Sequence, residues 1–319
     1  MTAPALRLPG WWDRFWFQAG SPGNLAAARI VIALHALWIL LSRDFAGIAA
    51  LPATFWGGVS DQTRWRFLLF PGEGPLEHVL QLAAVAALIG LTVGLWPRVT
   101  GLLAALLLYH LAPLETLFWK AGATERGFEV SILALTVLAF APSADAWSVR
   151  PHRAPLSREP WEYGWPLLLI QVLVVQIYLF GGYAKLFHVG TNWISAHNIR
   201  MLLLDFNQVD QDVVFHWLGP WIAARPWASL LTAVGAIALD FGFIAILFWK
   251  GMRKVILPIA LLFHVGILLT MNIFFLNLPQ LLVFVDWDRL AGRLTRRSPL
   301  QTAVPIPPAP PAATPRSCT

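Results

Sequence analysis

The chain has 319 residues, of which 57% are hydrophobic and only 13% are charged, and its mean hydropathy is +0.62. This composition is too apolar for a soluble domain and is typical of a polytopic helical membrane protein. The net charge of +6 comes from basic residues in short loops between apolar stretches, so it indicates membrane topology and not nucleic-acid binding. The single cysteine, Cys318, excludes an internal disulfide and a thiolate metal cluster.

The order of apolar and polar segments predicts an all-α transmembrane helix bundle of about eight spans, preceded by a short interfacial helix. Residues 1–22 form the N-terminal segment, in which Trp11–Gln18 is aromatic and charged and is expected to lie on the membrane surface. The transmembrane domain covers residues 23–288. Its expected spans are residues 24–41, 75–95, 99–114, 122–140, 165–193, 228–249, 255–273 and 274–287, the last being short and broken by Pro279.

Two further segments have distinct compositions. The loop 42–74 is long and rich in aromatic and basic residues, which favours a structured cap over a free linker. Residues 289–319 are first basic and then rich in proline and alanine, so we expect a disordered tail. The distribution of lysine and arginine over the loops predicts that both termini of this multi-pass protein lie in the cytoplasm, and we expect the membrane to be a bacterial inner membrane.

The stretch Gln171–Trp193 is an apolar helix that also carries polar side chains. Gln171, Tyr178 and Lys185 follow one another at seven-residue steps, which places them on one stripe. A lysine that faces lipid costs several kcal/mol, so the stripe should face protein or a wet cavity. Gly181 and Gly182 lie one turn before the lysine and allow either a second helix or a ligand to approach closely.

Two groups of polar side chains are candidates for chemistry within the spans. Lys185 and Glu129 both fall near the outer ends of their helices and could form a pair, either as a structural tie or as a general base with its partner.

The second group lies nearer the midplane and consists of Asp240, His264, His35 and His110. Asp240 and His264 belong to consecutive antiparallel helices at similar depth, so they are expected hydrogen-bond partners, in a helix joint or a proton relay. The histidines lack the spacing of metal ligands, and no metal is predicted.

Three stretches of the chain resemble the HTTM-domain family, the membrane domain of vitamin K-dependent gamma-carboxylase and related bacterial membrane proteins. They are IYLFGGYAKLFHVGTNW (Ile177–Trp193), LAFAPSADAWSV (Leu138–Val149) and the region Ala238–Trp287. The resemblance implies a helix bundle in which Lys185 matches the base that deprotonates reduced vitamin K. It also implies a reduced quinone as cofactor, which would enter from the bilayer. Tyr178, Tyr183 and Glu129 are the expected neighbours of this site.

Two other functions remain open from the sequence. The chain could be a non-catalytic membrane module that serves the maturation or assembly of a partner protein, which the outer, amphipathic segment Ile194–Pro226 would contact. It could also be a small-solute or proton transporter that uses the midplane histidines and Asp240. The chain has no phosphate-binding glycine loop, so nothing resembles an ATP-driven transporter. The lipid bilayer is the one partner that all three functions share.

Overall fold

The computed structural model describes residues 10–52, 74–118, 128–149, 158–209 and 213–296, and all regular elements in these ranges are helices. The chain divides into two compact units, Met1–Val285 and Asp286–Thr319. The first unit carries the apolar helices. In the second, the described part forms α15 (Trp287–Arg296), a polar helix with Asp288, Arg289 and Arg293. The residues expected to form a disordered tail, 297–319, lie outside the described ranges.

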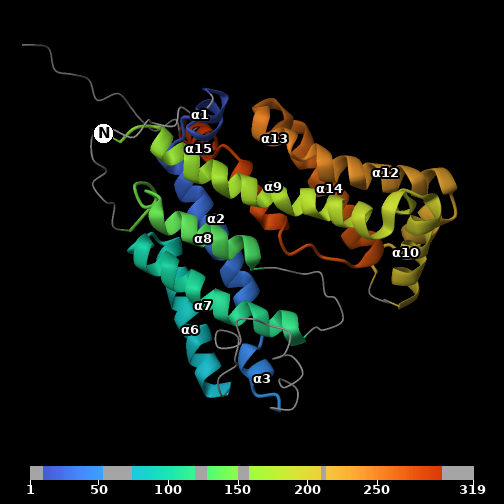
Figure 1. Cartoon of the computed structure of the whole chain (residues 1–319), viewed down its shortest axis with the longest axis horizontal. Coiled ribbons are helices and arrows are strands. Elements are labelled where there is room, and N and C mark those ends of the chain that lie inside the picture. The colour runs from blue at the N-terminus through green and yellow to red at the C-terminus, as the bar shows by residue number, and fades with distance from the viewer. Residues whose placement is uncertain (1–9, 53–73, 119–127, 150–157, 210–212, 297–319) are drawn as a thin grey trace, which may run out of the picture. The chain divides into compact units, whose positions relative to one another are not determined.

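The first unit begins with α1 (Gly10–Trp16), which agrees with the short N-terminal helix predicted from the sequence. Its long helices are α2 (Pro22–Leu41), α6 (Gly74–Thr92), α7 (Pro97–Phe118), α8 (Glu129–Phe140), α9 (Trp161–Val189), α12 (Pro226–Gly242) and α14 (Arg253–Met271). The shorter ones are α3 (Phe45–Ala49), η1 (Gly190–Trp193), α10 (Ala196–Val209), α11 (Leu218–Ala223), α13 (Ala245–Phe248), η2 (Lys250–Met252) and η3 (Leu278–Phe284). Figure 1 shows their arrangement.

Five segments in the described ranges are long and apolar enough to cross a membrane. They are Pro22–Leu41, Pro75–Thr92, Trp161–Trp193, Pro226–Phe248 and Lys250–Met271. Two shorter apolar helices, Pro97–Ala112 and Glu129–Phe140, accompany them. These segments confirm the all-α, multi-pass architecture and are compatible with about eight spans.

Local signals in the sequence set several helix ends. Ser21 caps α2, because its hydroxyl accepts a hydrogen bond from the Asn24 amide at 3.3 Å, and Pro22 fits the first helical turn. Gly190, with φ of 67°, ends α9, and Asn272, in the left-handed conformation, ends α14. Gly94 has φ of 76° in the tight turn between α6 and α7, where a side chain would be strained.

The helices of the first unit pack around α2 and α9. α2 contacts α6, α8, α9 and η3, and its buried alanines at positions 26–28, 33 and 36 let these neighbours approach closely. α9 contacts α1, α8 and α12, and its C-terminal end continues into η1, which contacts α10 (Figure 1). α10 and α11 pack on α12 through a small cluster of Ile199, Leu203, Ala223 and Ala233.

The expected last span, residues 274–287, does not form one continuous helix. After Asn272 the chain leaves the helical conformation, and it then forms the 3₁₀-helix η3, in which Gln280, Leu281, Val283 and Phe284 are buried. His35 on α2 contacts this segment: its Nε2 lies 2.8 Å from the Leu276 carbonyl oxygen. The residues of η3 are therefore buried against protein, as a membrane environment requires of non-helical backbone, whereas Asn272, Phe274 and Phe275 before them are exposed.

Arg29 is a charged residue of the apolar helix α2, and its side chain is completely buried. Its guanidinium donates to the main-chain carbonyls of Ser143 and Trp147, the latter at 2.5 Å, and reaches Thr92 at the end of α6 at 3.5 Å. One buried cation on α2 therefore holds the last residue of α6 and the segment that follows α8 against α2.

Candidate functional site

The candidate site is an ion pair between the two helices α9 and α12. Lys185 Nζ lies 2.6 Å from Asp240 Oδ2, and the side chains are 30% and 9% exposed. A lysine in an apolar helix needs such a partner, because an unpaired charge in hydrocarbon is costly. Of the two surroundings expected for the stripe, protein or a wet cavity, Lys185 thus meets protein, in the form of α12.

The other two members of the stripe are held by packing and hydrogen bonds. Gln171 donates to the Val283 carbonyl at 3.0 Å and accepts a hydrogen bond from Arg253 at 3.0 Å. Tyr178 is 9% exposed and stacks on Phe243, with ring centroids 3.8 Å apart. The stripe thus faces α12, α14 and η3 along its length.

Gly182 allows the two helices to approach at the level of the ion pair. A Cβ built at this position would lie 2.9 Å from Asp240 Cβ and 3.0 Å from the Phe241 ring. A Cβ on Gly181 would meet nothing closer than Asp240 Oδ1, at 4.0 Å. Gly182 is therefore required for helix packing, while a small side chain at Gly181 would fit in ordinary contact with the carboxylate.

Aromatic rings border the ion pair on two sides. Lys185 Nζ lies 5.1 Å from the centroid of the Trp193 ring, in a cation–π arrangement. Tyr178 contacts His264 edge to face, with centroids 5.7 Å apart, and His264 packs in turn on Phe275 at 4.5 Å. The Lys185 ammonium, the Asp240 carboxylate and a histidine are thus gathered in one apolar surrounding.

The level of the pair differs between the two helices. Lys185 lies close to the end of α9, whereas Asp240 lies about 21 Å along α12 from Pro226, at about 1.5 Å per residue. Asp240 also falls inside the apolar segment Pro226–Phe248. The position of Asp240 along α12 therefore places the Lys185 ammonium farther from the membrane surface than the position of Lys185 near the end of α9 suggested.

Two predicted neighbours of Lys185 do not join it. The predicted pairing with Glu129 is wrong, because Lys185 pairs with Asp240, while Glu129 lies at the exposed start of α8. Tyr183 is 54% exposed and stacks on Phe187, so it lies on an exposed face of α9. Tyr178 is the predicted neighbour that the structure brings close to the pair.

The four residues of the predicted midplane group are divided among separate interactions. His35 contacts Ser131 and the Leu276 carbonyl, and His110 pairs with Glu77 at 2.9 Å. The expected hydrogen bond between Asp240 and His264 is absent: Asp240 accepts from Lys185, and His264 Nδ1 donates to its own helix, to the Ala260 carbonyl at 2.7 Å. These four side chains therefore do not line one path.

Sequence reasoning did not single out several polar residues that the structure buries. Glu77 is fully buried, Arg29 is fully buried, and the Asp145 side chain is 4% exposed and bonded to Arg158 and Tyr163. Each of these charged residues lies in or next to an apolar helix. Because an unpaired buried charge is costly, the sequence position alone indicated that each has a partner. The identity of the partner depended on the fold.

The chain matches the model of one protein family. The HTTM domain matches residues 17–288, which include every residue of the candidate site. No curated protein and no solved structure matches the chain.

Proposed function

Because the chain belongs to the HTTM-domain family, we propose that it is a multi-pass membrane enzyme in which Lys185 and Asp240 handle the proton of a lipid-soluble reduced quinone. The ion pair of 2.6 Å between two apolar helices is the observation that carries this proposal. We place the protein in a bacterial inner membrane with both termini in the cytoplasm, as the distribution of basic residues favours.

The proposed proton transfer depends on one proton that the Lys185 amine and the Asp240 carboxylate share in an apolar surrounding. When the carboxylate of Asp240 holds the proton of the pair, the Lys185 amine is a free base. The amine then accepts a hydroxyl proton from the bound molecule, and the Asp240 carboxyl group stays within hydrogen-bond distance of the ammonium. A reduced quinone, when bound, would supply that hydroxyl proton, and its oxidation to the quinone would pass two electrons and two protons in total to dioxygen, which gives hydrogen peroxide.

The residues around the pair fit a planar apolar molecule with a polar edge. A Cβ at Gly181 would stay 4.0 Å from Asp240 Oδ1, and the Lys185 side chain is 30% exposed near the end of α9, so a ligand can approach the pair from this side. The Trp193 ring beside the Lys185 ammonium offers aromatic surface for a quinone ring.

The test is the oxidation of reduced menaquinone by the purified chain in lipid nanodiscs under air, followed by quinol fluorescence. We expect Lys185→Ala to lower the rate by about 100-fold or more, since general acid–base groups contribute that much, while Asp240→Asn also lowers it. Lys254→Ala, which removes an exposed lysine at the start of α14, should leave the rate unchanged. An equal rate in wild type and Lys185→Ala would reject the proposal.

A second candidate is a non-catalytic module that contacts a partner protein through the α10–α11 region. The exposed aromatic residues there favour it: Trp217 is 64% exposed, and Trp221 is 40% exposed beneath Arg225, whose guanidinium lies 4.0 Å from its ring. Cross-linking of a partner that is lost in Trp217→Asp, with quinol oxidation absent in wild type, would favour this candidate over the first.

A further inference from the structure

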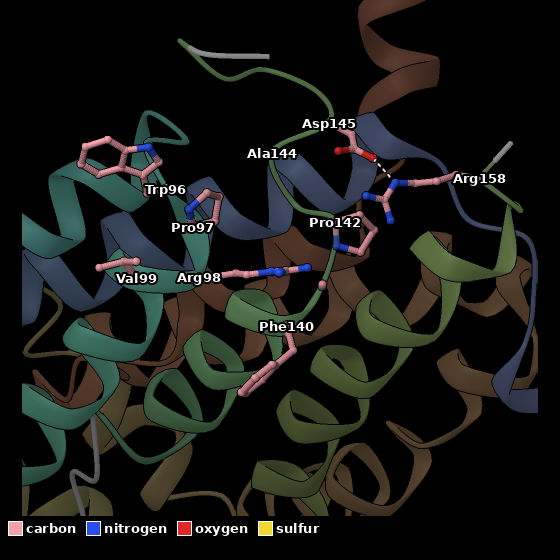
Figure 2. A pocket seen from close by; sticks show the side chains of 10 residues that line it. Trp96, Pro97, Arg98, Val99, Phe140, Pro142, Ala144, Asp145 and Arg158 are labelled. Atoms are coloured by element: carbon pink, nitrogen blue, oxygen red, sulfur yellow. Dashed lines mark ion pairs between the residues drawn. The ribbon is translucent and has the colours of Figure 1, made fainter. Parts of the chain in front are cut away.

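A pocket with a volume of about 340 Å³ lies at the end of the first unit where α6 turns into α7 and where the chain leaves α8. Its wall includes Trp96, Arg98 and Val99 from the turn and the start of α7, Phe140 from the end of α8, and Asp145 and Arg158 from the segments that follow (Figure 2). This volume is within the range of sites that bind small molecules.

The two arginines of the pocket differ in their partners. Arg158 is neutralised, because its Nε lies 2.8 Å from Asp145 Oδ2 and its Nη1 lies 3.2 Å from Glu162 Oε2. Arg98 has no hydrogen-bond or ion-pair partner among the residues that the structure describes. Its side chain extends across the pocket toward Pro142 (Figure 2). The pocket therefore presents one uncompensated cation.

The rim of the pocket is apolar and aromatic. Phe140 is 66% exposed, Val99 is 62% exposed and Trp96 is 57% exposed. Trp96 and Val99 lie at the ends of apolar helices, where tryptophan marks the boundary between lipid headgroups and acyl chains. A free cation beside an exposed apolar rim matches a ligand with an anionic head and a hydrocarbon chain.

We propose that this pocket binds the headgroup of an anionic phospholipid, with the Arg98 guanidinium on the phosphate and with Phe140 and Val99 against the first part of an acyl chain. The distribution of basic residues predicts that this end of the helices faces the cytoplasm, and basic pockets between helices on that side bind anionic lipid headgroups. The site does not involve the Lys185–Asp240 pair, so it stands whether or not the quinol proposal is correct.

The experiment measures lipid binding by native mass spectrometry of the full chain released from detergent micelles. The probes are phosphatidylglycerol, phosphatidylcholine and inorganic phosphate, each titrated alone, and phosphate is then added as a competitor of phosphatidylglycerol. The variants are Arg98→Gln, Phe140→Ala and, as the matched control, Arg14→Gln, which removes another exposed arginine, in α1, on the same predicted side. Circular dichroism of each variant checks that the helices are retained.

We expect wild type to bind phosphatidylglycerol about tenfold more tightly than phosphatidylcholine, a difference of about 1.4 kcal/mol. Arg98→Gln should remove this preference, Phe140→Ala should weaken both lipids, and Arg14→Gln should bind as wild type does. An unchanged preference in Arg98→Gln would overturn the proposal. Competition by millimolar phosphate together with unchanged binding by Phe140→Ala would also overturn it, because the site would then be one for a soluble anion.

Discussion

Lys185 on α9 and Asp240 on α12 form an ion pair of 2.6 Å at a point where the two helices touch through Gly182. A side chain at residue 182 would collide with Asp240 and Phe241, so the helices can approach only with glycine there. Each of the two charges lies in an apolar surrounding and is stabilised by the other. The pair therefore joins helix packing to the chemistry proposed for this site, and the two roles can be separated by substitution.

Removing one member of the pair should destabilise the protein more than removing both. Asp240→Leu leaves the Lys185 ammonium without a partner, and breaking such a partly buried pair costs on the order of 2 kcal/mol at its exposure. The double variant Lys185→Met/Asp240→Leu should recover most of this loss, because hydrophobic residues of similar volume tolerate the setting. Thermal unfolding in one detergent measures the coupling, and purely additive losses would contradict the pairing.

Gly182→Ala should push α9 and α12 apart. The new methyl group would lie 2.9 Å from Asp240 Cβ, and overpacking of this kind costs about 1–3 kcal/mol. Gly235→Ala on α12 is the matched control, since a Cβ there meets nothing within 4 Å and alanine favours a helix. The prediction is a lower unfolding temperature for the first variant and an equal or higher one for the second. Equal unfolding temperatures for Gly182→Ala and wild type would argue against a tight contact.

The sequence was sufficient to predict the long apolar helices and the face on which Lys185 lies, but not the interruption of the last expected span, residues 274–287. A seven-residue spacing in an apolar helix defines one stripe, and the cost of a charge in lipid turns that stripe toward protein. Both inferences depend on local geometry, which is why they hold in the structure, where Gln171 and Tyr178 are buried beside α12 and η3.

The partner of Lys185 could not be predicted in the same way. Depth was counted from helix ends, and this placed Glu129 opposite the lysine. α12 instead passes α9 with Asp240 well along its length, so residues far from an end on one helix meet residues close to an end on the other. The offset of two helices along their axes depends on tertiary packing, so it cannot be predicted from residue spacing within either segment.

Arg29 should be irreplaceable by lysine. Its guanidinium donates to the carbonyls of Ser143 and Trp147 at the same time, and a lysine ammonium lacks the planar fork that spans both. We expect Arg29→Lys and Arg29→Leu to lower the free energy of unfolding by about 3 kcal/mol, because buried carbonyls lose their donors. The exposed Arg14 provides the control, and Arg14→Lys should unfold at the wild-type temperature. Stability of Arg29→Lys equal to wild type would show that the carbonyls find other donors.

His35 should hold the non-helical segment after α14 against α2. A carbonyl oxygen can only accept, so the Nε2 atom donates to Leu276, and the neutral ring then accepts at Nδ1, where the Gln280 amide nitrogen lies 3.1 Å away. His35→Phe removes both bonds and leaves Gln280, which is fully buried, with fewer partners. Amide hydrogen exchange over residues 272–284 should accelerate, and the free energy of unfolding should fall by about 2 kcal/mol.

Two further variants decide whether this effect comes from the hydrogen bonds or from the shape of the ring. His188→Phe, at an exposed position near the end of α9, should leave exchange over residues 272–284 unchanged. In His35→Phe the buried Gln280 amide keeps only its bond from Nε2 to Ser131 Oγ, at 3.1 Å, and the double variant His35→Phe/Gln280→Leu removes this poorly satisfied amide, so it should be more stable than His35→Phe alone. If the double variant instead loses further stability, the bond from Gln280 to Ser131 is enough to satisfy the amide, and the imidazole acts mainly by filling space between α2 and η3.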